Sequence, residues 1–138
     1  MAERDKVFTA AINVRWADLD AYAHVNGTTY FTYMETARVQ LYESIGLDCL
    51  HGPVHTFIAK SECNYRIAIG PDDKVQVDVV VSRVGNTSLD LLYKLHDTKG
   101  QTYATGKTVM VMVDAETAQP VVVPECFHEI VDPTVDFS

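Results

Sequence analysis

Three consecutive segments in the second half of the chain alternate between apolar and polar residues, with short breaks between them. They run from about Val75 to Ser82, from Leu89 to His96 and from Gln101 to Asp114. Strict alternation over such lengths is typical of β-strands that bury one face. The breaks are too short for a crossover connection, so we expect three antiparallel strands joined as hairpins.

The third segment predicts what covers the sheet. One of its faces begins with the small residues Ala104 and Gly106, which would let a helix approach closely. The opposite face carries Val109, Val111 and Val113. An apolar outer face needs a covering partner, so we also expect a homo-oligomer.

The first half of the chain contains one further strand and one long helix. Residues 7–16 alternate, and we expect one shared apolar face: Phe8, Ala10, Ile12, Val14 and Trp16. Residues 28–45 repeat their apolar positions every three or four residues, which indicates an amphipathic helix with Arg38 on its polar side. Asn26 suits the N-cap, and Gly46 suits a left-handed C-terminal cap.

Residues 56–69 are also expected to be extended, and the chain after Asp114 is expected to be a loop. The element order is therefore a strand, one helix, and four or five strands. This order predicts an α+β fold of one domain over residues 1–138.

Composition narrows the possible functions. The 138 residues carry a formal charge of −8, which disfavours nucleic-acid binding. No apolar run is long enough to span a membrane, and the charged N-terminal segment does not look like a signal peptide, so we expect a cytoplasmic protein. The three cysteines form no metal-binding pair, and Gly52-Pro53 separates His51 from His55, so we expect no metal site.

The most unusual segment joins the first strand to the helix. It places Asp18, Asp20, His24, Asn26 and Gly27 within ten residues. The sequence DLDAYAHVNGTTYFTYMETAR resembles the D-x-D-x-x-x-H-V-N-N-x-x-Y segment of hotdog-fold acyl-CoA thioesterases, the 4-hydroxybenzoyl-CoA thioesterase-like family. The strand order fits the same family, and the resemblance extends from about Val7 to Pro124.

The resemblance implies a fold and a reaction. The fold would be a hotdog, an antiparallel sheet of five to six strands wrapped around one long central helix. The reaction would be hydrolysis of an acyl-CoA to a carboxylic acid and CoA, without a cofactor or metal. The assembly would be a homodimer that forms a homotetramer.

The resemblance also implies roles for four catalytic-site residues. Asp20 matches the catalytic carboxylate, which acts as a nucleophile or as a general base. Gly27 lies where a backbone N–H polarises the thioester carbonyl, although it replaces the second asparagine of the motif. Asn26 would cap the helix that carries this donor. His24 would either orient Asp20 or the attacking water, or hold the loop by a structural hydrogen bond.

Two carboxylates nearby are expected to be structural. Asp18 is interpreted as a turn or cap residue. Another branch of hotdog thioesterases uses a glutamate on the helix, but here Glu35 lies beside Arg38, which favours an ion pair.

Elementary chemistry supports hydrolysis independently. Amides near a helix N-terminus lack intrahelical partners and can bind an oxyanion. A thiol has a pKa of about 8.5, so a thiolate leaves without a strong general acid. The alternatives are a non-catalytic acyl-CoA-binding protein and a hotdog hydratase or dehydratase that acts on enoyl thioesters.

Overall fold

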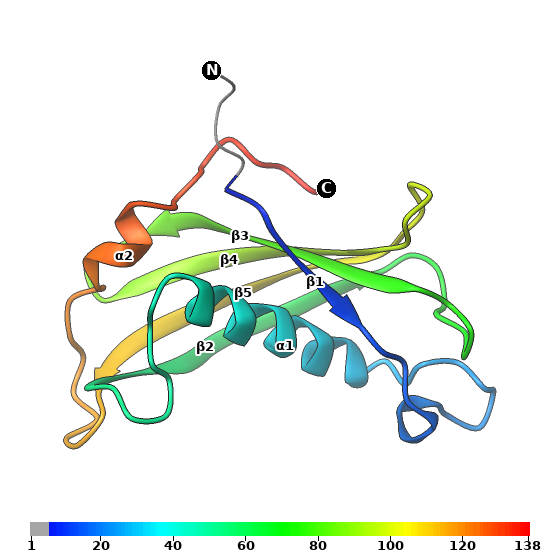
Figure 1. The fold of residues 1–138 in the computed structure, drawn as a ribbon, viewed down its shortest axis with the longest axis horizontal. Coiled ribbons are helices and arrows are strands. Elements are labelled where there is room, and N and C mark those ends of the chain that lie inside the picture. Colours follow the sequence, from blue (N-terminus) through cyan, green and yellow to red (C-terminus); the bar gives the residue numbers. More distant parts are fainter. Residues whose placement is uncertain (1–5) are drawn as a thin grey trace.

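In the computed structural model, which describes residues 6–138, five antiparallel strands form one sheet that curves around helix α1 (Thr29–Ser44) (Figure 1). The strands have these bounds: β1 (Phe8–Ile12), β2 (Val54–Tyr65), β3 (Val75–Val84), β4 (Ser88–His96) and β5 (Thr102–Asp114). Their order across the sheet is β1-β3-β4-β5-β2. The predicted α+β class and the predicted hairpins β3–β4 and β4–β5 are confirmed.

The contact between α1 and the sheet follows the predicted face of β5. Its alternate residues from Ala104 to Met112 are buried. Gly106 lies against the Met34 side chain of α1, because a Cβ atom at this position would lie 2.7 Å from Met34 Sδ. A larger residue here would have to displace the end of that side chain.

The start and the polar face of α1 differ from the predictions made from the sequence. The helix begins at Thr29 with Thr28 as its N-cap, so Asn26 is not the N-cap and Gly27 precedes the helix. Arg38 is only 5 % exposed, because its guanidinium reaches Tyr93 on β4. The C-terminus is as predicted, since Gly46 follows it with a φ of 83°.

Strand β1 is shorter than the sequence pattern indicates. It ends at Ile12, and Trp16, which was expected on the buried face, is exposed. The cause is the Asp18 carboxylate, which accepts a hydrogen bond from the Arg15 backbone N–H and turns the chain into a short 3₁₀ helix, η1 (Trp16–Asp18). A side chain thus ends the alternation.

Two further differences concern the borders of the sheet. Strand β2 covers twelve residues from Val54, slightly earlier than expected, and forms one edge of the sheet. Phe57 and Ile58 on this edge are exposed. The segment after Asp114, expected to be a loop, contains the four-residue helix α2 (Glu125–His128). Among the described helices, none has the length and hydropathy to cross a membrane.

Candidate active site

The segment between η1 and α1 is held by a network of three side chains, Arg15, Asp18 and Tyr33, here called the Asp18 network. The Asp18 carboxylate accepts hydrogen bonds from the Arg15 backbone N–H at 2.9 Å and from the Arg15 guanidinium at 2.9 and 3.2 Å. Tyr33 of α1 donates its hydroxyl proton to Asp18 Oδ2 at 2.7 Å. The network therefore ties the segment to the first turns of the helix, and it confirms the structural interpretation of Asp18.

The network also sets the charge of Asp18. Burial alone would raise the pKa of this carboxyl, but hydrogen bonds from Arg15 and Tyr33 and the charge of Arg15 outweigh burial, so its pKa lies below the ordinary value. Burial and the neighbouring carboxylate raise the pKa of Tyr33 in turn. Asp18 is thus a carboxylate and Tyr33 a neutral donor at neutral pH.

Asp20 begins a tight loop that closes on itself. Its backbone N–H donates to His24 O at 2.8 Å, and its side-chain Oδ1 accepts from the backbone N–H groups of Tyr22 and His24 at 2.9 and 3.2 Å. Ala23 adopts a φ of +60° at the tip, which is uncommon for a residue other than glycine. Within residues 6–138, Oδ2 of Asp20 has no hydrogen-bond partner, so this oxygen can accept a proton or attack.

Gly27 presents the complementary group. The Asn26 carbonyl accepts from the Thr29 N–H at 2.8 Å, and the Asn26 side chain accepts from the Thr28 N–H at 3.0 Å. The Gly27 carbonyl accepts the Tyr65 hydroxyl proton at 2.6 Å. The two peptide groups that flank Gly27 are therefore fixed, and among the described residues the Gly27 N–H has no acceptor.

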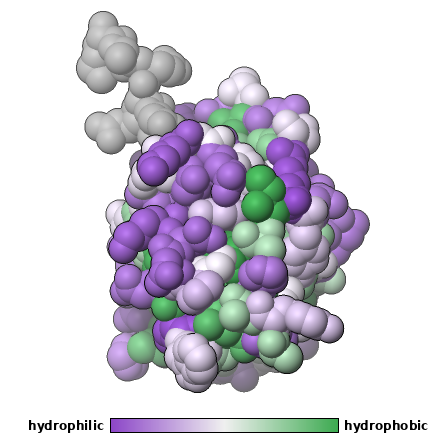
Figure 2. Space-filling view, turned by 90° about the vertical axis from the view of Figure 1, so that its right-hand side faces the viewer, coloured by the Kyte–Doolittle hydropathy of each residue, from purple (hydrophilic) through white to green (hydrophobic). Residues whose placement is uncertain are grey.

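The two unpaired groups lie at the same end of α1. Leu19 and Val25 form an antiparallel bridge, and the Asn26 N–H donates to the Asp18 carbonyl at 2.8 Å, so the Asp20 loop folds back against the Gly27 turn. Figure 2 views this end of the molecule and shows a strip of hydrophobic surface among hydrophilic residues. A carboxylate oxygen and an amide donor that are both unpaired among the described residues suit attack on a carbonyl compound.

The other residues singled out by the sequence are placed as follows. The His24 side chain is exposed, and its hydrogen bonds to Asp20 are made by its backbone. The expected ion pair between Glu35 and Arg38 is present at 3.7 Å. The Asn26 side chain accepts a hydrogen bond from the Thr28 N–H, so it caps the turn before α1 and not the helix itself.

The cysteines and the possible metal ligands of the chain lie apart from this segment or are spread over it. Burial raises the pKa of the thiols of Cys49, Cys63 and Cys126, so none is a ready thiolate nucleophile. In the part of the chain that the structure describes, no three His, Cys, Asp or Glu side chains cluster as metal ligands. His51 instead lies 3.6 Å from Asp48 in the loop after α1.

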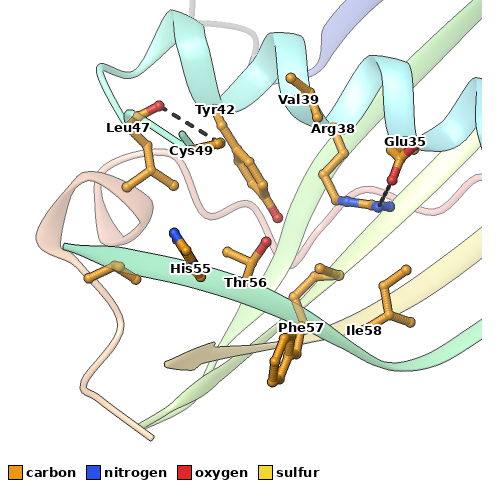
Figure 3. A pocket seen from close by; sticks show the side chains of 12 residues that line it. Glu35, Arg38, Val39, Tyr42, Leu47, Cys49, His55, Thr56, Phe57 and Ile58 are labelled. Carbon is orange, nitrogen blue, oxygen red and sulfur yellow. Dashed lines mark hydrogen bonds and ion pairs between the residues drawn. The ribbon is translucent and has the colours of Figure 1, made fainter. Parts of the chain in front are cut away.

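A pocket of about 410 Å³, which the sequence did not predict, lies between the C-terminal half of α1 and the start of β2 (Figure 3). Arg38 and Tyr42 line it from the helix, and Thr56 and Ile58 from the strand. No local sequence signal marks this pocket, because elements with unrelated patterns form its two sides.

Comparison with known proteins agrees with this architecture. The structure superposes on the PA2801 protein from Pseudomonas aeruginosa with a TM-score of 0.83 at 33% identity, covering 88% of this chain and 95% of that one. A thioesterase from Thermus thermophilus, solved with coenzyme A and Zn, superposes with a TM-score of 0.77 at 32% identity, covering 88% and 94%. The curated relative YsmA of Bacillus subtilis (strain 168), an uncharacterized protein, is 29% identical over 114 residues, 83% of this chain and 78% of its own.

A five-stranded antiparallel sheet around one helix, together with these matches, defines a hotdog-fold thioester hydrolase. The chain belongs to the thioesterase-like superfamily, whose family model matches residues 14–131.

Proposed function

We propose that this protein hydrolyses acyl-CoA thioesters, with the Asp20 carboxylate as the catalytic group and the Gly27 N–H as the oxyanion donor. The observation that carries the proposal is that Asp20 Oδ2 and the Gly27 N–H, both without a hydrogen-bond partner in residues 6–138, lie at the same end of α1. Both groups are held by backbone hydrogen bonds, so little reorganisation is needed when substrate binds. The whole chain acts as a single domain in this proposal.

The reaction needs no other group. The thioester carbonyl oxygen accepts the Gly27 N–H, and Asp20 Oδ2 either takes a proton from an attacking water or attacks the carbonyl carbon itself. The negative charge that develops on the carbonyl oxygen stays near the Gly27 amide. On the general-base route, collapse of this intermediate breaks the C–S bond and gives the carboxylic acid and CoA thiolate, which takes up the proton held by Asp20. On the nucleophilic route, collapse gives CoA thiolate and an acyl-Asp20 anhydride, which water then hydrolyses to the carboxylic acid with return of the free carboxylate.

His24 and Asn26 act as positioning residues in this account. The His24 backbone N–H shares Asp20 Oδ1 with Tyr22, which leaves Oδ2 as the reactive oxygen. The Asn26 side chain holds the Thr28 amide and, with Tyr65, fixes the peptide that follows Gly27. Burial raises the pKa of the Tyr30 hydroxyl, and nearby charges, that of Asp20 among them, add to the effect, so Tyr30 is neutral at neutral pH.

We also propose that the protein is a homodimer formed through the edge of β2. A twelve-residue edge strand with exposed Phe57 and Ile58 is an aggregation hazard unless another strand covers it. Two copies of β2 pair antiparallel about a two-fold axis, which satisfies the edge of both. The Phe57 side chain, opposite Val111 on the outer face, supports a second contact that makes a homotetramer. Sedimentation that gives a monomer at micromolar concentration would refute this assembly.

The function is tested by incubating the protein with aliphatic and aryl acyl-CoAs and following both products. Free thiol is measured with a disulfide dye, and the acid by mass spectrometry. Equal amounts of thiol and acid support hydrolysis. A hydrated thioester without free thiol would identify a hydratase, and calorimetric binding without turnover would identify a binding protein; either result overturns the proposal.

A further inference from the structure

The pocket between α1 and β2 has mainly apolar walls but a polar side. Leu47, Val54, Ile58 and Met110 contribute apolar surface. Arg38, Tyr42 and Thr56 contribute hydrogen-bonding groups on facing elements (Figure 3). A volume of about 410 Å³ lies within the range of small-molecule sites. A pocket built only for hydrocarbon would not need these polar groups.

Arg38 is a buried cation that makes few hydrogen bonds among the described residues. Its side chain is 6 % exposed, and within residues 6–138 its one hydrogen bond runs from Nη1 to the Tyr93 hydroxyl at 3.1 Å. The ion pair with Glu35 is long, at 3.7 Å, and the Glu35 side chain is 62 % exposed. A guanidinium has five N–H donors, so several remain for a further acceptor.

Tyr42 has a buried hydroxyl that makes no hydrogen bond of good geometry within residues 6–138. The residue is 1 % exposed, and the side chain of Thr56 is the neighbouring hydroxyl that can accept its proton. Burial raises the pKa of this hydroxyl, which keeps its proton available for donation. Figure 3 shows the hydroxyl reaching toward Thr56 across the pocket. A buried donor left unsatisfied costs about 1–3 kcal/mol, so native proteins rarely retain one without a use.

We propose that this pocket holds the distal end of the acyl group and selects acyl groups that carry an oxygen acceptor there, a hydroxyl, keto or carboxylate oxygen, over all-hydrocarbon groups of the same length. The inference deepens the proposed function and rests on it. An oxygen at this end accepts from Tyr42 Oη and from the Arg38 guanidinium. A terminal methyl group leaves both donors unsatisfied, and sites of this kind discriminate strongly against analogues without the polar group.

The route from the reactive end to the pocket follows from the proposed dimer. Within one subunit, Gly27 precedes α1, and Arg38 lies nine residues beyond Thr29, about 14 Å along the helix axis at about 1.5 Å per residue. Antiparallel pairing of two β2 strands about their midpoint sets Tyr65 of the partner subunit opposite Val54, at one border of the pocket. Because Tyr65 touches Gly27 in each subunit, Gly27 of the partner subunit then lies at that border. In the proposed dimer, the catalytic loop of the partner subunit therefore lies at the border of the pocket.

The test uses matched CoA thioesters of short, medium and long chain length that end in a methyl, a hydroxyl or a carboxylate group. At the best length, we expect kcat/KM for an oxygen-ended substrate to exceed that for the methyl-ended one by at least about tenfold. Tyr42→Phe keeps the ring that packs on Phe127 and removes only the hydroxyl. It should reduce the preference for the hydroxyl-ended substrate over the methyl-ended one to below about threefold. Arg38→Gln should do the same for the carboxylate-ended substrate.

The control is Tyr103→Phe, which removes the hydroxyl of another buried tyrosine that does not line the pocket. It should leave the preference intact. Wild-type hydrolysis of all thioesters at equal rates, or a preference that survives Tyr42→Phe, overturns the inference while the proposed function stands. If no thioester is hydrolysed, the proposed function fails, and calorimetry with non-hydrolysable thioether analogues tests the pocket directly. Equal affinity for oxygen-ended and methyl-ended analogues then overturns the inference.

Discussion

The Asp18 network gives a quantitative prediction about stability. Asp18→Ala leaves the Tyr33 hydroxyl buried without its acceptor, which costs about 1–3 kcal/mol. The lost pairing with the Arg15 side chain, which is 69 % exposed, adds about 0–1 kcal/mol. We therefore expect the free energy of unfolding to fall by about 1–4 kcal/mol, measured by urea denaturation followed by circular dichroism.

A double-mutant cycle isolates the cause. Tyr33→Phe removes the group that Asp18→Ala leaves unsatisfied, so the double variant should be less destabilised than the sum of the single variants by about 1 kcal/mol or more. Additive losses, or a cost of Asp18→Ala below about 0.5 kcal/mol, would refute the reasoning.

The network also predicts a pH dependence. The pKa of Asp18 is lower in the folded protein than in the unfolded chain, where it is about 3.9. Its stabilisation is therefore complete above that unfolded value and is lost as the pH falls through the folded value. The stability difference between wild type and Asp18→Ala should stay constant from neutral pH to about pH 5 and shrink below about pH 4. A difference that persists unchanged in acid would contradict this assignment.

Three further predictions concern single side chains. Tyr65→Phe removes the donor to the Gly27 carbonyl and should lower kcat about 2- to 13-fold with little change in KM, measured by thiol release; an unchanged kcat would remove Tyr65 from the account. Gly106→Ala places a methyl group against Met34 and should destabilise the fold by about 1–3 kcal/mol in urea; a neutral effect would show that Met34 moves aside freely. Ala23→Gly relieves a φ of +60° and should leave the melting temperature unchanged or raise it, whereas a clear drop would show that the loop tip is not strained.

The sheet could be predicted from sequence because its strands are long and regular. The alternation from Thr102 to Asp114 identified the face that α1 covers, including the close approach at Gly106. The end of α1 at Gly46 could also be predicted from the sequence, because glycine is strongly preferred in a left-handed cap. Such features depend on local periodicity and on backbone conformation, which neighbouring residues in the sequence determine.

The errors occurred where distant or side-chain interactions override local pattern. Arg38 looked like a surface residue because its partner Tyr93 lies on another element, 55 positions away. Trp16 continued an alternating pattern that the Asp18 carboxylate interrupts. Asn26 was placed at the N-cap of the helix instead of in the turn before it, because a side chain that accepts from Thr28 resembles an N-cap in sequence.

The candidate site, too, could be predicted from the sequence only in part. The motif placed Asp20, His24, Asn26 and Gly27 in one segment, and the structure folds that segment into a compact loop and turn at the end of α1. The motif could not reveal that Tyr65 of β2 holds the Gly27 carbonyl, nor that Arg38 and Tyr42 line a pocket with Thr56. Those relations arise only when β2 packs beside the helix.

The most direct test of the central claim is thiol release from the best acyl-CoA substrate by wild type and by Asp20→Asn. Asp72→Asn, in the exposed turn before β3, serves as the matched control. The account predicts that Asp20→Asn folds with an unchanged circular dichroism spectrum and loses at least about 10²-fold in kcat, while the control keeps its rate. Full activity in a correctly folded Asp20→Asn protein would contradict the proposed catalytic role of this carboxylate.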